Sequence, residues 1–266
     1  MSKRLCKAFG VLFLLLELLF LPLAAELMLK EHLSDLPTIE IVTMATNIGS
    51  IALCLLMSFS AMSEQDSYPL RTVLFQLIIF VCSAIPISDL IARTVDTAGR
   101  PDLNMLANTV YYMLAISLAY LVLVYEFRLI GARNKPALIG ARRLALVLTL
   151  LGELLTLLNI RFGYFFTITE TGRYVSAPTY WVSYIVPVAL IVIMIVTAAR
   201  EMVPGKQQRA FFFFWLFALV TTIPQVWRSD LSFQLTGYTL SLVVLYLNVQ
   251  SELDTFSIKD SNQEEI

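Results

Sequence analysis

The sequence predicts an all-α integral membrane protein, folded as a polytopic bundle of eight transmembrane helices. Of its 266 residues, 58% are hydrophobic and only 15% are charged, whereas a soluble domain carries about a quarter charged residues. About 20 apolar residues in a row span the ~30 Å hydrocarbon layer as a helix. Eight such windows follow one another, over residues 8–28, 41–62, 72–92, 104–127, 144–163, 180–199, 210–227 and 232–250.

The distribution of basic residues predicts the orientation of these spans. If the amino terminus is cytoplasmic, thirteen of the nineteen Lys and Arg residues fall in cytoplasmic segments and six in outer loops, as the positive-inside rule requires. The connections between spans are short. We therefore expect residues 1–250 to form one transmembrane domain and residues 251–266 to form a polar cytoplasmic tail, with both termini in the cytoplasm.

The first window is either a retained transmembrane helix or a cleaved secretory signal. It resembles a signal with a cut after Ala25, because the basic start MSKRLCK is followed by a Leu-rich stretch and by LPLAAE. Glu17 lies in the middle of this stretch, and the apolar run is as long as a full span. Both observations favour a retained helix. If the segment were cleaved, seven helices would remain, with the amino terminus outside.

The residue inventory excludes several chemistries. His32 is the only histidine, which rules out bis-histidine haem ligation, HExxH zinc hydrolysis and a Ser-His-Asp triad within one chain. All six lysines lie outside the hydrocarbon zone, so a retinal Schiff base has no attachment point, and no phosphate-binding glycine motif is present. We expect no catalytic residue, no metal, no cofactor and no nucleic acid partner, so the protein is not an enzyme.

Two carboxylates are predicted at membrane depth. Glu17 and Glu153 each lie about ten residues from the nearest cytoplasmic basic residue, hence ~15 Å deep at 1.5 Å per residue. No Lys or Arg lies at that depth to pair with them. Each is therefore protonated, hydrogen-bonded to a neighbouring helix or facing a wet cavity. Interhelical hydrogen bonding, proton relay and cation recognition all remain open for them.

Polar residues also recur at spacings of three and four, which places them on single helix faces that should point inward. Two such stripes are Thr43, Asn47, Ser50, Cys54 and Ser58, and Asn104, Asn108, Tyr111 and Ala115. The stripes are typical of close helix packing, and a ligand-lined cavity is the alternative. Four side chains join the two carboxylates as candidates for a ligand-binding site or polar core: Asn47, Asn108, Asn159 and Gln225.

The longest outer connection, RFGYFFTITETGRYVSAPTYW, predicts a small extracytoplasmic β-hairpin between the fifth and sixth helices. FFTIT and YVSA read as two short strands, joined by a turn that contains glycine. Such a hairpin could cap the outer mouth of the bundle, with Phe165, Gly172 and Tyr174 as the candidate lid residues. An interfacial aromatic belt is the alternative interpretation of its aromatic side chains.

The second half of the chain resembles a known module. LLNIRFGYFFTITETGRYVSAPTYW, a basic turn with KQQR, LVTTIPQVW and TGYTLSLVVLYLNVQ follow in the order seen in the multi-helix membrane sensor module of bacterial GGDEF diguanylate cyclases and histidine kinases. The resemblance covers about residues 104–254, and the first hundred residues only in helix spacing. The matching positions are Asn159, Gly172, Tyr174, Pro224, Gln225 and Gly237.

The resemblance implies a receptor-like sensor in a bacterial cytoplasmic membrane. This sequence departs from the family after the last helix, where QSELDTFSIKDSNQEEI stands in place of a cyclase opening or a kinase histidine. We therefore expect the sensor to bind a small ligand and to signal through a separate cytoplasmic protein. The alternative is a small proton- or cation-coupled transporter or channel component that uses Glu17 and Glu153, although no inverted repeat is recognisable.

Overall fold

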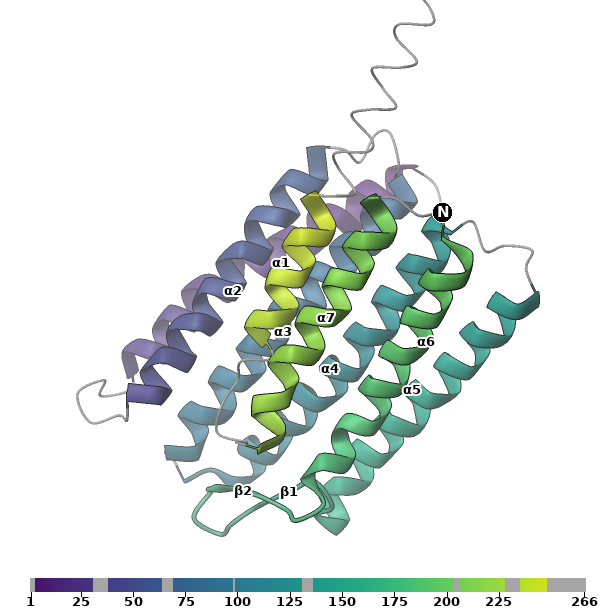
Figure 1. Cartoon of the computed structure of the whole chain (residues 1–266). Coiled ribbons are helices and arrows are strands. Elements are labelled where there is room, and N and C mark those ends of the chain that lie inside the picture. The colour runs from purple at the N-terminus through teal and green to yellow at the C-terminus, as the bar shows by residue number, and fades with distance from the viewer. Residues whose placement is uncertain are drawn as a thin grey trace, which may run out of the picture.

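The computed structural model describes residues 3–30, 38–63, 69–97, 99–130, 136–202, 206–227 and 235–247. Its elements form an antiparallel helical bundle with a small two-stranded sheet at one end (Figure 1). An unlabelled helix over Leu235–Leu247, here named the C-terminal helix, is drawn in yellow. In order, the other elements are α1 (Lys3–Lys30), α2 (Thr38–Ser63), α3 (Pro69–Thr97), α4 (Pro101–Leu129), α5 (Pro136–Phe162), β1 (Phe166–Ile168), β2 (Tyr174–Ser176), a 3-10 helix (Tyr180–Tyr184), α6 (Ile185–Glu201) and α7 (Lys206–Trp227).

The predicted class, a multi-pass bundle of apolar helices, is confirmed. Within the described residues, six segments are long and apolar enough to cross a membrane, and they lie on α1 to α5 and on the 3-10 helix with α6. Two shorter apolar helices follow, Phe211–Ile223 within α7 and the C-terminal helix. The first six predicted windows overlap the six long segments, and the last two overlap the shorter helices. Three helices begin at a proline, where the missing N–H costs nothing.

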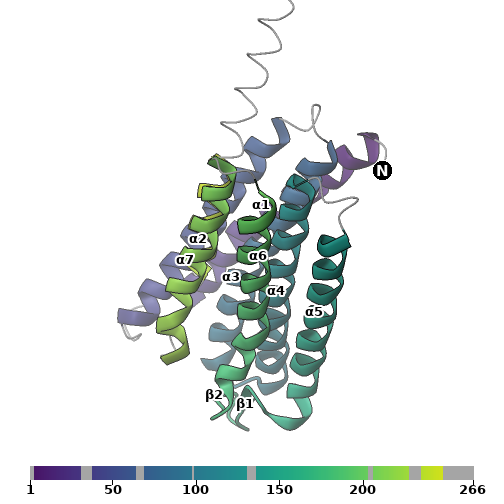
Figure 2. The same cartoon turned by 45° about the vertical axis from the view of Figure 1, so that its right-hand side comes forward.

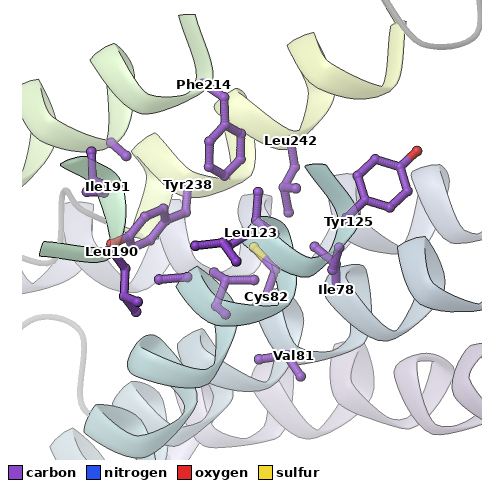
Figure 3. Close-up of a cluster of buried hydrophobic side chains, with 14 of the residues drawn as sticks. Ile78, Val81, Cys82, Leu123, Tyr125, Leu190, Ile191, Phe214, Tyr238 and Leu242 are labelled. Atoms are coloured by element: carbon purple, nitrogen blue, oxygen red, sulfur yellow. The ribbon is translucent and has the colours of Figure 1, made fainter. Parts of the chain in front are cut away.

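α3 and α4 form the centre of the bundle. α3 packs against α1, α2 and α4, while α4 also packs against α5 and α6. Figure 2 shows α5 at the edge of the molecule, on the side away from α2. The main apolar cluster fills the space where α3, α4, α6, α7 and the C-terminal helix meet (Figure 3). Its labelled members are Ile78, Val81, Cys82, Leu123, Tyr125, Leu190, Ile191, Phe214, Tyr238 and Leu242.

α5 shows that this bundle has its polar side chains inside and its leucines outside. The buried face of the helix follows a spacing of three and four, and it carries Thr149, Gly152, Thr156 and Asn159. The opposite face exposes Leu150, Leu151, Leu154, Leu157 and Leu158. A helix surface made of leucine is stable in contact with lipid chains and unstable in contact with water. This pattern supports the assignment of the bundle to a membrane.

The polar stripe predicted on the second span is buried as expected, since all five of its side chains lie inside the bundle. On α4, Asn104 and Tyr111 are buried, while Asn108 and Ala115 are half-buried. The inward orientation of both stripes follows from the 3.6-residue period of the helix. These two faces therefore pack on neighbouring helices and leave the apolar faces for lipid.

Gly237 allows the C-terminal helix to approach α7 closely. A Cβ atom at this position would lie 1.9 Å from Thr221 Oγ1 and 2.7 Å from Thr221 Cβ. Gly140 on α5 is a matched contrast, because it is exposed and a Cβ there meets no atom within 4 Å. Alanine substitutions at the two glycines therefore separate the effect of packing on stability from the effect of helix propensity.

We predict that Gly237→Ala lowers the thermal unfolding midpoint of the purified protein in detergent by about 3–10 °C. An overpacked contact costs about 1–3 kcal/mol, and each kcal/mol shifts the midpoint by about 2–4 °C in a domain of this size. Gly140→Ala should leave the midpoint unchanged or raise it, because alanine is the better helix former by about 1 kcal/mol. Equal midpoints for the two variants would contradict the close contact between the C-terminal helix and α7.

Candidate functional site

The hairpin between α5 and α6 is a two-stranded antiparallel sheet, in which Phe166 pairs with Ser176 and Ile168 with Tyr174. Its turn is closed by backbone hydrogen bonds, from Thr169 N to Arg173 O at 2.9 Å and from Gly172 N to Thr169 O at 2.9 Å. Gly172 has φ +88, a conformation that residues with a side chain rarely adopt. The two short strands fall within the segments FFTIT and YVSA, and Gly172 lies in the turn between them.

Asp96, near the end of α3, holds the hairpin onto the turn between α3 and α4. Asp96 Oδ1 accepts hydrogen bonds from the Tyr174 backbone N–H at 2.6 Å and from Asn104 Nδ2 at 2.9 Å. Asn104 Nδ2 also donates to the Gly172 carbonyl at 2.6 Å, and Asn104 is fully buried. Asn108 Nδ2 donates to Asn104 Oδ1 at 2.6 Å, which fixes the Asn104 amide in this orientation.

The backbones of the hairpin turn and of the α3–α4 turn are in direct contact. A Cβ atom on Gly172 would lie 3.0 Å from Gly99 Cα and 3.0 Å from Arg100 N. Gly99 has φ +64 and lies in the turn itself. No side chain fits between these two segments, so both the left-handed backbone and the close approach require glycine at position 172.

Asn159 fixes the other end of the hairpin, where the chain leaves α5. Its Oδ1 accepts from the backbone N–H of Phe165 at 2.6 Å, and its Nδ2 donates to the Phe166 carbonyl at 3.1 Å. Gly163, with φ +63, donates its N–H to the Asn159 carbonyl at 2.8 Å and ends the helix. Asn159 is thus fully buried and satisfied by the backbone of the strand that follows it.

An aromatic stack anchors the strands to α4. The ring of Phe166 stacks on Tyr112 of α4 and on Tyr174 of β2, with centroid separations of 5.4 Å in both cases. The hydroxyls of Tyr112 and Tyr174 are 3.2 Å apart, within hydrogen-bond distance. Burial raises the pKa of the Tyr174 hydroxyl well above its ordinary value, so this hydroxyl stays neutral and can donate.

Polar pairs join other helices within the bundle. Asp89 Oδ2 on α3 accepts from Asn47 Nδ2 of α2 at 2.7 Å and from Arg93 Nε at 2.9 Å. This contact neutralises the Asp89 carboxylate and links α2 to α3. Asn47 is fully buried. The predicted candidate Asn47 is therefore part of a hydrogen-bonded contact between α2 and α3.

Two further carboxyl groups are each bonded through one oxygen to a neighbouring helix. Ser117 Oγ of α4 donates to Glu153 Oε1 at 2.8 Å, and Thr197 Oγ1 of α6 donates to Glu126 Oε1 at 2.9 Å. The second oxygen of each group has no hydrogen-bond partner within the described residues. For Glu153, the hydrogen bond from Ser117 corresponds to one of the predicted alternatives, bonding to a neighbouring helix.

The predicted site residues do not form one site. Asn108, Asn159, Phe165, Gly172 and Tyr174 gather at the hairpin, whereas Glu17, Asn47 and Glu153 lie between three other helix pairs. Gln225 lies in α7, but its side chain is outside the described residues, as is the predicted tail 251–266.

Sequence reasoning missed Asp96, Asp89 and Glu126. Asp96 fell in a predicted outer loop, and its partner Tyr174 is 78 positions away along the chain. Glu126 lies two residues before Arg128 at a predicted span end, which made it look like an interfacial residue. The Asp89 and Arg93 pair carries a usable signal, because a carboxylate and a guanidinium four residues apart share one helix face.

Comparisons of the chain with family models, with curated proteins and with solved structures find no match.

We predict that Asp96→Ala releases the hairpin from the bundle. The substitution removes the acceptor of two hydrogen bonds, and bonds to a charged group contribute about 1.5–3 kcal/mol each. The Tyr174 amide should then exchange with deuterium at least tenfold faster in detergent-solubilised protein, because local opening becomes less costly. The matched control is Glu170→Ala, at an exposed acid on the hairpin turn itself. Equal Tyr174 exchange in both variants would contradict the anchoring role of Asp96.

Proposed function

We propose that this protein is a membrane receptor-like sensor, which binds a small ligand at its hairpin end and signals through a separate cytoplasmic protein. The observation that carries the proposal is the attachment of one exposed hairpin to three parts of the bundle. Asp96 ties it to α3, Tyr112 to α4 and Asn159 to α5. A ligand that binds the hairpin in one position more tightly than in another shifts these helices relative to one another.

The packing of the bundle supports transmission to its other end. α4 contacts α6, and α6 contacts α7. The C-terminal helix joins the same apolar cluster through Tyr238 and Leu242 (Figure 3). Close-packed interiors transmit displacement because they have few voids to absorb it. A shift of α3 and α4 at the hairpin end is therefore passed to the helix that precedes the tail.

The proposed topology has eight spans, a retained first helix and both termini on the cytoplasmic side of a bacterial inner membrane. The start of α1 and the hairpin lie at opposite ends of the bundle (Figure 1), which fits a cytoplasmic amino terminus and an outer hairpin. α1 packs against α3 and α2, and it buries Cys6, Glu17 and Ala24. These contacts support a helix that stays with the bundle.

Photo-cross-linking tests the sensor proposal. A benzoylphenylalanine at Phe256 in the tail should cross-link one cytoplasmic protein in native membranes, and Asp96→Ala should change the yield while Glu170→Ala should not. The reason is that Asp96 bonds the hairpin to α3, whereas Glu170 is an exposed residue on the hairpin turn. The proposal fails if the wild-type chain cross-links no protein and deletion of residues 251–266 leaves every phenotype of the cells unchanged.

A second candidate function, a proton- or cation-coupled transporter, is favoured by the unpaired oxygen of Glu153 inside the bundle. A transporter should catalyse uptake or carry current in reconstituted vesicles, and Glu153→Gln should abolish either signal. Ser117→Ala is the matched variant, since it removes the hydrogen bond but keeps the carboxyl group. A sensor should show no uptake and no current in the same vesicles.

A further inference from the structure

Unpartnered polar atoms concentrate between α1, α2 and α3. Glu17 of α1, Ser58 of α2 and Gln76 of α3 are each 0% exposed. Both carboxyl oxygens of Glu17, the Ser58 hydroxyl and both amide atoms of Gln76 have no hydrogen-bond partner in the part of the chain that the structure describes. Native proteins leave few buried polar groups unpaired, so three together require an explanation.

The three side chains line one interface. Ser58 lies beside the Glu17 carboxyl group. Glu17 stands between Phe13 and Phe20 on α1, and both of these rings stack on Phe80 of α3, with centroid separations of 5.4 and 5.6 Å. Gln76 precedes Phe80 by one helical turn and so shares its face of α3. The Ser58 hydroxyl therefore lies beside the Glu17 carboxyl group, and the buried Gln76 amide lies one helical turn along α3 from the contact between Phe80 and α1.

No basic side chain neutralises Glu17 within the described residues. The titratable group that faces it from α2 is the Cys54 thiol, which is next to Cys82 of α3. Neither thiol carries a positive charge. An ionised carboxylate without a cationic partner is very costly in an apolar interior. The Glu17 carboxyl group is therefore either neutral through a bound proton or balanced by a cation from outside the chain.

We infer that Glu17, Ser58 and Gln76 form an intramembrane binding site for a monovalent cation, with Glu17 as its charged ligand. A single carboxylate balances one positive charge. The two carboxyl oxygens, the hydroxyl and the Gln76 carbonyl supply up to four hard oxygen donors, which suit a sodium ion and not a soft transition metal. A proton would instead bind to one carboxyl oxygen of Glu17. Among the described residues no group of three His, Cys, Asp or Glu side chains is placed to hold a metal ion.

This site is separate from the hairpin end and holds for either proposed function. In a sensor, the bound cation would stabilise one arrangement of α1 against α3. In a transporter, it would be the coupling ion. The test of the site measures the occupancy of Glu17 directly, whereas the test of the sensor measures cross-linking of the tail. Either proposal can therefore be refuted without refuting the other.

Carbodiimide labelling of the full chain tests the site and separates the two cations. Dicyclohexylcarbodiimide modifies protonated carboxyl groups in apolar surroundings, and mass spectrometry locates the modified residue. Modification of Glu17 should fall as pH rises. If sodium binds, replacing choline chloride by sodium chloride at constant pH should reduce modification at least fivefold. If the site takes only protons, the two salts should give the same pH profile.

Two substitutions connect the labelling to the proposed ligands. Ser58→Ala and Gln76→Leu remove neutral oxygen donors and should weaken sodium protection at least fivefold or shift the midpoint of the pH profile. The control residue is Glu153, which is hydrogen-bonded to Ser117 on the far side of α4. Its modification should be unaffected by either substitution. An unchanged Glu17 profile in both variants would overturn the three-residue site.

Thermal unfolding gives a second measurement that does not require the reagent to reach Glu17. A bound cation stabilises the folded state by an amount that grows with the concentration of the cation, so the wild-type midpoint should rise with sodium chloride relative to choline chloride, or with falling pH. Glu17→Gln keeps the shape of the side chain and should remove that response. If the wild-type protein and Glu17→Gln respond equally to both sodium and pH, no cation is bound at Glu17 and the inference is wrong.

Discussion

Every helix of this bundle has to turn its polar side chains toward another helix, because a hydrocarbon layer offers them no hydrogen-bond partner. The constraint explains the inverted pattern of α5, with Thr149 and Thr156 inside and leucines outside. It also explains why Glu153 accepts a bond from Ser117 of α4 and why Glu126 accepts one from Thr197 of α6. Each pair fixes the rotation of one helix against the next, which apolar packing alone does less specifically.

The same constraint shapes the hairpin end, where the chain leaves helical geometry. Backbone groups released at the end of α5 are bonded by the Asn159 side chain. Asp96 and Asn104 bond the backbone of β2 and of the hairpin turn in the same way. The contacts that satisfy the backbone are therefore also the contacts that attach the hairpin to the helices. Between α1, α2 and α3, the buried polar atoms of Glu17, Ser58 and Gln76 have no hydrogen-bond partner within the described residues. The proposed cation site rests on this exception.

The helices and the buried face of the second span were predictable, because both depend on apolar length and a period of 3.6 residues. The hairpin was predictable from alternating residues around a glycine turn. The anchors were not. Asp96 meets Tyr174 across 78 positions, and Glu126 meets Thr197 across 71. No local pattern encodes such pairs, since they depend on how the helices pack. For Glu17, the distance along the chain from the basic residues placed the side chain at membrane depth, but only the packed structure identifies Ser58 as its neighbour.

The contact between Gly172 and Gly99 has a consequence for how such chains can diverge. A Cβ atom on Gly172 would lie 3.0 Å from Gly99 Cα, so neither turn can gain bulk while the other keeps its present form. Insertions and deletions are usually tolerated in exposed turns, but here a change of length in one turn displaces the backbone of the other. Among related chains, the hairpin turn and the α3–α4 turn should therefore change length together, as a coupled pair of indels.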